Sequence, residues 1–403
     1  MKIVVAQDAL HAEGGVETYM ASVIPGLRAR GHSVALLFVR RRGAPGFDLI
    51  GEVDGPQVAV EPPDIDAAFA ELRAWGPDVC FSNNMAPLDV ERRALDEWPV
   101  VKFMHGYFGT CVSALKTHAF PFRTACSRTL GPACLALYVP RHCGSLTPAA
   151  LTGGYRWARA QQHLLTRYAA VVVASDHMAE EYARHGVPRE RLAMLPLFPS
   201  LTLRDSPAAA GDRVLFLGRM TDLKGGDLLI RAVAGAARQL GRSIPLVMAG
   251  DGPQRSAWER LASSERIDAV FPGWLDADQR LAVLSSAAVL AVPSVWPEPF
   301  GLVGLEAAAM GVPAVAFDTG GIRQWLHHQI SGLLVPPSGG HAALATALSE
   351  ILQDRGLRDR LSRGALNTAR QMSVDAHLSG LERVLQVAAR PSASVRHDPV
   401  THR

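Results

Sequence analysis

Residues 290–311 read LAVPSVWPEPFGLVGLEAAAMG, and this stretch decides how the rest of the chain is interpreted. The apolar run 288–292 predicts a buried strand, the prolines after it predict a loop, and the pattern of 300–310 predicts a helix. The loop carries one carboxylate, Glu298, and the helix carries a second, Glu306. Free N–H groups at a helix start favour an anion such as phosphate, and two acids beside it suit the hydroxyls of a sugar. We therefore expect the ligand to bind here.

Length and charge exclude several classes of protein. A chain of 403 residues is too long for one ordinary domain, and 48% hydrophobic content is ample for two cores. A net charge of +3 is too small to indicate nucleic-acid binding. No run reaches the roughly 18 apolar residues that span a bilayer, and the first strand follows Met1 without a signal peptide. We expect a cytoplasmic protein, with peripheral attachment to the inner membrane surface as an alternative.

Strands and helices alternate along both halves of the chain, and the predicted strands are apolar throughout. Such strands are typical of parallel sheets covered on both faces, so the predicted fold class is α/β with two Rossmann-like doubly wound domains. The predicted strands are 2–7, 33–39, 78–81, 100–104 and 169–174, then 213–217, 244–249, 269–271, 288–292 and 314–317. The predicted divisions are an N-terminal domain 1–198 with a Cys-rich insertion at 110–150, a linker 199–212, a C-terminal domain 213–373, a final helix 374–389 and a disordered tail 390–403.

Three further motifs follow predicted strands, where such domains bind ligands. Gly14-Gly15 precedes a helix and could let the backbone approach a phosphate, although an ordinary tight turn explains the pair equally well. Arg219 and Lys224 could clamp a diphosphate, and the alternative is two solvated basic side chains. His105 could contact a reacting sugar, although a lone histidine is more often structural.

Taken in order, GGVET, the histidine after VVKFM, GRMTDLKGG, MAGDGP, FPGW and EPFGLVGLE resemble the motifs of retaining glycosyltransferases of family 4, which have the GT-B fold. The resemblance covers nearly the whole chain, and its most specific part is the E-x7-E spacing of Glu298 and Glu306. It implies two domains facing across a cleft. It also implies that a sugar moves from a UDP- or GDP-linked nucleotide-sugar to an acceptor hydroxyl, with no cofactor for catalysis.

The resemblance implies a role for each motif. Arg219 and Lys224 would neutralise the leaving diphosphate, and Glu306 would bind the ribose. Glu298 would bind the donor sugar, and His105 would contact that sugar near the reaction centre. The N-terminal domain would hold the acceptor, and the helix 374–389 would return to it and couple domain closure to binding. The other donor-binding groups that it implies are Gly14, Gly15 and the backbone amides of Phe300, Gly301, Leu302 and Val303.

The insertion departs from the family pattern and contains four of the five cysteines, Cys111, Cys126, Cys134 and Cys143. A loop of this length rarely stands without support. A structural zinc held by the four thiolates would supply that support, and an iron–sulfur cluster is a less favoured choice. Because the spacing contains no C-x2-C pair, unligated or disulfide-bonded cysteines are the third alternative.

No Asp or Glu occurs from Trp98 to Ser175, and this segment contains eight basic residues. A field of one sign favours an anionic acceptor, such as an acidic glycan or a phosphate-linked lipid, or contact with an anionic membrane. A solvated basic face explains the pattern equally well. The eight residues are Lys102, Lys116, Arg123, Arg128, Arg141, Arg156, Arg159 and Arg167.

The main alternative to an enzyme is a non-catalytic nucleotide-sugar-binding protein with the same cleft. The full set of candidate cleft residues argues against it, because loss of activity usually removes at least one of them. An NAD-dependent dehydrogenase is a third reading. It would need G-x-G-x-x-G to open a helix after the first strand of a domain, and neither domain has this motif.

Overall fold

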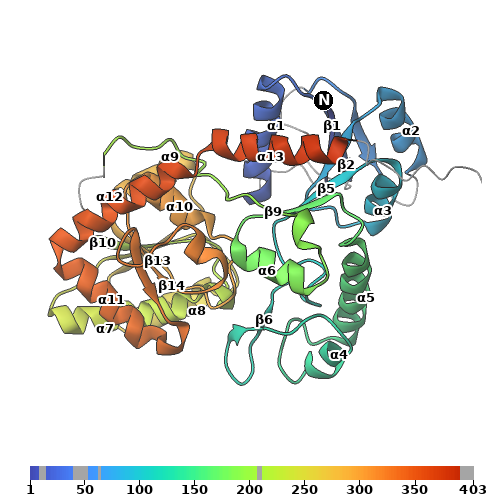
Figure 1. The fold of residues 1–403 in the computed structure, drawn as a ribbon. Helices are drawn as coiled ribbons and strands as arrows, with labels where there is room; N and C mark the ends of the chain where they lie inside the picture. Colours follow the sequence, from blue (N-terminus) through green and yellow to red (C-terminus); the bar gives the residue numbers. More distant parts are fainter. Residues whose placement is uncertain (9–14, 40–52, 62–64, 207–210, 391–403) are drawn as a thin grey trace, which may run out of the picture.

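The computed structural model describes residues 1–8, 15–39, 53–61, 65–206 and 211–390, which form two α/β domains (Figure 1). The N-terminal domain contains a seven-stranded sheet of order β3-β2-β1-β4-β5-β8-β9. The C-terminal domain contains a six-stranded sheet of order β12-β11-β10-β13-β14-β15. All pairings between the described strands of these two sheets are parallel. The predicted class of two doubly wound domains is confirmed.

The N-terminal sheet is apolar on both faces, so helices cover both. In β1 (Lys2–Gln7), Ile3 packs in the cluster that contains α1 (Gly15–Ala29), whereas Val4 packs in the cluster that contains α2 (Asp66–Trp75). The other elements are β2 (Ser33–Val39), β3 (Gln57–Val60), β4 (Val79–Ser82), α3 (Leu88–Glu97), β5 (Val100–Met104), β8 (Ala170–Val173), α6 (Asp176–Arg184), η1 (Arg189–Arg191) and β9 (Leu192–Met194).

The C-terminal domain repeats this pattern. In β10 (Arg213–Leu217), Phe216 packs in the cluster that contains α7 (Gly226–Leu240), and Leu215 packs in the cluster on the other face. The remaining elements are η2 (Asp222–Lys224), β11 (Leu246–Ala249), α8 (Arg255–Ser264), β12 (Ala269–Gly273), α9 (Ala277–Ser285), β13 (Ala287–Val292), α10 (Leu302–Ala309), β14 (Ala314–Phe317), η3 (Gly320–Gln324), β15 (Gly332–Val335), η4 (Pro337–Gly339), α11 (Gly340–Gln353) and α12 (Arg355–Gln371).

The order of the strands indicates where a ligand binds. In each sheet the order in which strands are added reverses beside the first strand, between β1 and β4 in one domain and between β10 and β13 in the other. Ligands of such sheets bind in the crevice at the carboxyl ends of the strands beside this switch point. The loop after β13 contains Glu298, and the turn after β10 contains Arg219 and Lys224. The topology therefore places these predicted residues at one crevice.

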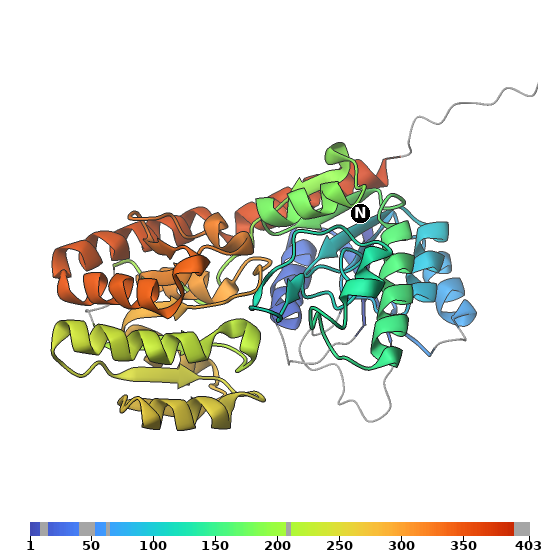
Figure 2. The same cartoon turned by 90° about the horizontal axis from the view of Figure 1, so that it is seen from below.

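The last helix, α13 (Val374–Ala389), leaves the C-terminal domain and crosses α1 of the N-terminal domain, with which it is in contact (Figure 1, Figure 2). Arg30, just after α1, pairs with Glu382 at 3.2 Å, and the His32 Nε2 atom lies 3.0 Å from the same carboxylate. One buried apolar cluster also includes side chains of α1, α13 and α10. The two domains therefore share part of their core.

The insertion between β5 and α5 (Pro148–Leu164) forms little regular structure. It contains an antiparallel hairpin of β6 (Thr117–His118) and β7 (Thr124–Ala125), followed by the short helix α4 (Ala133–Leu137). It lies at the end of the N-terminal domain away from α13 (Figure 1). These elements are too short to show a period in the sequence, which is why only an irregular loop was predicted here.

Candidate active site

A cavity of about 300 Å³ lies between the two domains, where the switch-point loops meet. Both domains line it, so side chains far apart in the sequence face one small space. The predicted residues among its lining are Gly15, His105, Lys224, Glu298, Phe300, Gly301, Leu302 and Val303.

Lys224 and Glu298 form an ion pair in this cavity. The Lys224 Nζ atom lies 2.6 Å from Oε1 of Glu298, and the hydroxyl of Ser294 donates to the same oxygen at 2.5 Å. Nζ also lies 5.4 Å from the centroid of the Trp296 ring. Glu298 is only 4% exposed, so Lys224 and Ser294 compensate most of the charge of its carboxylate. A phosphate entering the cavity would compete with Glu298 for Lys224.

The first turn of α10 forms another wall. Gly301 precedes this turn with a φ of 86°, and no side chain caps it. A Cβ atom on Gly301 would lie 2.9 Å from Cδ1 of Ile322, so backbone conformation and available space both require glycine. The N–H groups of Leu302 and Val303 have no acceptor within the helix, because they belong to its first turn. They are suited to binding an anion in the cavity.

His105 faces the cavity from the N-terminal domain as a neutral imidazole. Its ring packs against Phe103 at a centroid distance of 4.2 Å, and its Nε2 lies 2.9 Å from Oδ1 of Asn83. Burial, and then the nearby charges of Lys102 and His377, lower the pKa of His105 to about 3. When Nε2–H donates to Asn83, the lone pair is at Nδ1, and His105 can accept a hydrogen bond there.

Tyr19, on the same wall, connects the cavity to the final helix. Its hydroxyl lies 2.8 Å from Nε2 of His377, and Nδ1 of His377 lies 2.8 Å from the carbonyl oxygen of Pro196. Because a carbonyl can only accept, Nδ1 carries the proton and Nε2 accepts from Tyr19. Burial lowers the pKa of His377 to about 4, which keeps the ring neutral. The helix α13 therefore supports the wall of the cavity.

Two predicted residues do not line this cavity. Glu306 is 3% exposed, accepts a short hydrogen bond from Ser200 and lies 3.4 Å from Arg280 Nη1. Arg219, two residues after the end of β10, has an exposed side chain. Gly14 lies outside the described residues. The ribose-binding and diphosphate-binding roles of Glu306 and Arg219 therefore stay predictions.

The structure adds Asn83, Ser294 and Trp296 to the predicted residues. Ser294 and Trp296 lie in the stretch that contains Glu298, so their nearness in the sequence was an available signal. Asn83 and His105 are 22 residues apart and follow the neighbouring parallel strands β4 and β5. Since parallel neighbours end at the same edge of a sheet, this pair could have been found from the strand order but not from spacing.

The basic segment, residues 98–175, is partly neutralised by acidic side chains from other parts of the chain. Two of its lysines are buried, and one of its arginines reaches the C-terminal domain. The field of one sign expected from the sequence is therefore weaker in the folded protein. The four ion pairs are Lys102 with Glu91 at 3.0 Å, Lys116 with Glu181 at 2.5 Å, Arg123 with Asp227 at 2.5 Å and Arg167 with Asp96 at 2.7 Å.

The insertion hairpin bridges the two domains beside the site. Nη1 of Arg123 donates to the carbonyl oxygen of Asp222 at 2.6 Å, and Nη2 lies 2.5 Å from Oδ2 of Asp227. Asp222 begins the turn that ends with Lys224. A larger cavity, of about 1300 Å³, lies next to this bridge and is lined by residues of both domains. The hairpin therefore contacts the loop that carries the candidate diphosphate-binding lysine.

The four cysteines of the insertion line a separate cavity of about 190 Å³, which shares no lining residue with the cavity at His105. All five cysteines are described, and none forms a disulfide. In the described ranges of the chain, no group of three or more His, Cys, Asp or Glu side chains is placed to hold a metal ion.

Two parallel-sheet domains with a cavity between their switch points define the GT-B class of fold. Residues 13–198 match the family model described as Glycosyltransferase Family 4, and residues 206–368 match the model described as Glycosyl transferases group 1. The chain belongs to glycosyltransferase family 4. The fold and family predicted from the sequence are confirmed.

Curated relatives match parts of the chain. The D-inositol 3-phosphate glycosyltransferase of Salinispora arenicola is 41% identical over 182 residues, which are 42% of this chain and 39% of the relative. The alpha-D-kanosaminyltransferase of Streptomyces kanamyceticus is 29% identical over 244 residues, which are 57% of this chain and 62% of the relative. The matches thus span less than two thirds of either relative.

Solved structures agree over almost the whole chain. A glycosyltransferase from Rickettsia africae ESF-5 has a TM-score of 0.68 at 16% identity, covering 96% of this chain and 98% of that one. HepE of Anabaena in complex with UDP-glucose has a TM-score of 0.69 at 19% identity, covering 96% of this chain and 100% of that one. At these identities the agreement concerns the fold alone.

Proposed function

We propose that this protein transfers a sugar from a nucleotide diphosphate-sugar to an acceptor hydroxyl with retention of the anomeric configuration. The observation that carries the proposal is the interdomain cavity in which Lys224, Glu298 and the first turn of α10 face His105. A cation beside free N–H groups suits a diphosphate, and a buried carboxylate suits sugar hydroxyls. Membership of the family supports the same class of reaction.

The donor would enter with its diphosphate between Lys224 and the start of α10. Its phosphate would replace Glu298 as the partner of Lys224, and the freed carboxylate would then bind the sugar. Glu306 would hold the ribose, and Arg219 would turn in from solvent to reach the diphosphate. We propose a UDP- or GDP-linked donor. UDP-glucose is the first to test, because a structural neighbour was solved with it.

Retention requires the acceptor to attack on the face from which the diphosphate departs. The bond from the anomeric carbon to the phosphate oxygen breaks, and a bond to the acceptor oxygen forms. The acceptor's proton passes to the departing phosphate oxygen. Lys224 and the N–H groups of Leu302 and Val303 would stabilise the charge on the leaving group, so the proposed chemistry includes no catalytic metal. His105 would accept a hydrogen bond from a donor-sugar hydroxyl at Nδ1.

The test is donor hydrolysis and transfer by the full chain with a panel of UDP- and GDP-sugars. We expect Lys224→Ala to lower kcat by on the order of 100-fold, because a preorganised charge at the leaving group is lost. Arg92→Ala, which removes a partly exposed cation of α3, is the control and should retain activity. Unchanged turnover in the Lys224 variant would overturn the assignment.

The same panel separates an enzyme from a non-catalytic nucleotide-sugar-binding protein. Both would gain thermal stability from the correct donor, because a ligand of the folded state raises Tm. Only the enzyme would release the nucleoside diphosphate. A donor that raises Tm and is neither hydrolysed nor transferred would support the binding protein.

We also propose an anionic acceptor, presented at a membrane surface in the cytoplasm. Of the eleven large hydrophobic side chains exposed in the described residues, five lie in the insertion, in a segment without acids. Exposed apolar side chains among basic ones fit an anionic bilayer. No described helix has the length and apolarity to cross one. The five are Phe120, Phe122, Leu135, Val139 and Leu146.

Co-sedimentation with phosphatidylcholine vesicles, with and without phosphatidylglycerol, tests the membrane contact. Binding should require the anionic lipid and should fall in Phe122→Ser/Val139→Ser. Ile330→Ser is the matched control, because Ile330 is 62% exposed in the C-terminal domain. Equal binding by all three proteins would contradict the proposed surface.

A further inference from the structure

The fold brings together four cysteines that lie in separate segments of the insertion. Cys111 lies in the loop after β5, Cys126 directly follows β7, Cys134 lies within α4, and Cys143 follows that helix. All four line one cavity of about 190 Å³. The fifth cysteine, Cys80, is buried in β4 and does not line it. Four free thiols at one cavity are the donor set of a metal centre.

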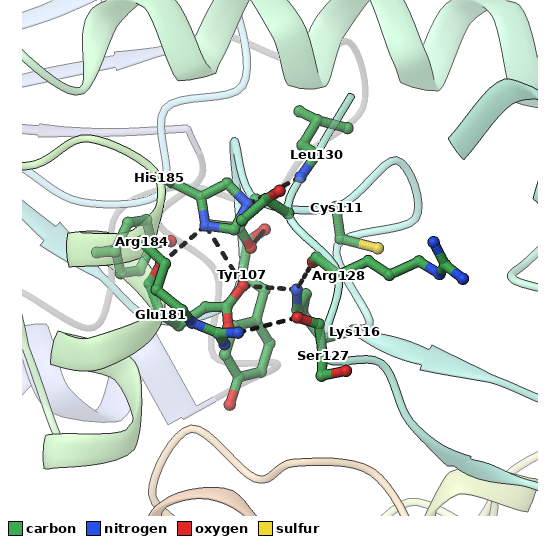
Figure 3. Close-up of polar contacts among 12 residues, drawn as sticks. Tyr107, Cys111, Lys116, Ser127, Arg128, Leu130, Glu181, Arg184 and His185 are labelled. Carbon is green, nitrogen blue, oxygen red and sulfur yellow. Dashed lines mark hydrogen bonds and ion pairs between the residues drawn. The ribbon is translucent and has the colours of Figure 1, made fainter. Parts of the chain in front are cut away.

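A buried network of charged groups anchors the segment that carries Cys126 (Figure 3). Lys116 pairs with Glu181 of α6 and donates to the carbonyl oxygen of Arg128 at 2.5 Å. The N–H of Cys126 donates to the carbonyl oxygen of Lys116 at 2.7 Å. The N–H of Leu130 donates to Nε2 of His185 at 3.0 Å, just beyond α6. One side of the cysteine cavity is therefore held against the core of the N-terminal domain.

The rest of the insertion has little to hold it. Its small buried apolar cluster contains Val112, Leu130 and Tyr138 with Ala158 of α5, and its two strands are two residues each. Small units without a sufficient core usually depend on disulfides or metals. Since no disulfide is present, ligation through the cysteines would supply the missing constraint.

The spacing of the ligands distinguishes one metal ion from a cluster. Four thiolates around one zinc each lie about 2.3 Å from it, which draws the sulfurs together and leaves no space between them. Here the four cysteines are among thirteen residues that line about 190 Å³, and no three metal-ligating side chains in the described part of the chain lie close enough to hold one ion. Cysteines around a four-iron cluster lie farther apart, because each binds a different iron.

We propose that Cys111, Cys126, Cys134 and Cys143 ligate a [4Fe–4S] cluster in this cavity. Arg128 and Arg141 also line the cavity, and their charges would compensate the net negative charge of four thiolates around the cluster. The structure thus favours a cluster over the single zinc that the sequence favoured. Because the cavity shares no residue with the one at His105, the cluster's role is to hold the insertion in shape. That shape includes the hairpin whose Arg123 contacts Asp227.

The experiment is native mass spectrometry and elemental analysis of the full chain, produced with iron and purified without oxygen. We expect about four irons and four acid-labile sulfides per chain, with the broad visible absorption of a cluster. Cys126→Ser and Cys134→Ser should lose most of the iron, and Cys80→Ser should retain it. One zinc per chain without sulfide would overturn the cluster in favour of a single ion.

A second measurement keeps the test independent of whether the variants fold. Thiol titration of the wild-type chain should show four additional reactive cysteines after the cluster is destroyed by oxidation and chelation and the thiols are reduced. Four thiols already reactive in the anaerobic protein, with neither iron nor zinc, would contradict any ligation at this site. Both readouts are independent of donor turnover, so failure of the proposed transferase activity would not affect them.

Discussion

The Lys224 Nζ atom lies 2.6 Å from the Glu298 Oε1 atom, although 74 residues separate the two. This ion pair joins the turn after β10 to the loop after β13, on the two sides of the switch point. It also stabilises a carboxylate that is almost completely buried. We therefore expect Lys224 and Glu298 to stabilise the free protein and to take part in the reaction once the donor is bound.

Removing one partner of this pair should affect stability and activity differently from removing both. Lys224→Met leaves the buried Glu298 carboxylate without its cation and should lower the free energy of unfolding by on the order of 2 kcal/mol. Adding Glu298→Gln removes the unpaired charge, so the double variant should regain part of that stability and stay inactive. Urea unfolding with donor-hydrolysis assays checks both. A double variant as unstable as Lys224→Met would show that the pair does not carry the effect.

Glycine at position 225 should be needed for the position of Lys224. Gly225 has a φ of 65°, and a Cβ atom there would lie 2.1 Å from the carbonyl oxygen of Pro293. Gly241 has a similar φ of 63° with nothing within 4 Å, so Gly241→Ala measures backbone strain alone. We expect Gly241→Ala to destabilise by about 1 kcal/mol. Gly225→Ala should destabilise more and also weaken donor binding, as measured by calorimetry. Equal effects of the two substitutions would refute the steric argument.

The contact between Arg123 and Asp227 should hold the hairpin onto the donor-binding domain. Both side chains are partly exposed, so the pair contributes only about 1 kcal/mol. Arg123→Asp should raise the donor KM several-fold, and the exchange Arg123→Asp/Asp227→Arg should restore it. Arg156→Asp changes an exposed cation of α5, away from the hairpin, and is the matched control for donor KM. If the exchange raises the donor KM as much as Arg123→Asp does, the two residues are not coupled.

Stability should fall in mild acid through His377. Its pKa is about 4 in the folded protein, compared with about 6.5 when unfolded, because burial disfavours the charged ring. Between these values the unfolded chain binds the extra proton, so stability rises with pH in that window and is lost as pH falls from about 6.5 to about 4. The maximum loss from this residue is about 3 kcal/mol. His105 should add to the loss, since its pKa is about 3.

Thermal unfolding from pH 4 to pH 7 checks this expectation. His377→Asn retains a donor for the carbonyl oxygen of Pro196 and removes the titrating ring, so its Tm should depend less on pH than that of the wild type. His341→Asn, at an exposed position in α11, is the control and should follow the wild-type profile. A His377 variant with the wild-type pH dependence would assign the effect to other groups.

Much of the fold was predictable because local patterns determine local elements. The apolar runs at β1, β5, β10 and β14 lie within a residue of the predicted strands, since buried parallel strands are apolar on both faces. β3 and β9 were missed because they are only four and three residues long, and apolar runs this short are not specific to strands. The helix after Glu298 begins at Leu302 and not at Phe300, because Gly301 adopts a left-handed conformation at its N-cap.

The sequence by itself determined the two doubly wound domains, the family, and the residue types at the strand ends. Periodicity and short motifs record these features within a few neighbouring residues. Only the tertiary structure decided the Lys224–Glu298 pair, the support of His105 by Asn83, the neutralisation of half the basic segment, and the shared cavity of the cysteines. These relationships join groups from separate elements, and their distances depend on how the sheets, the insertion and α13 pack together.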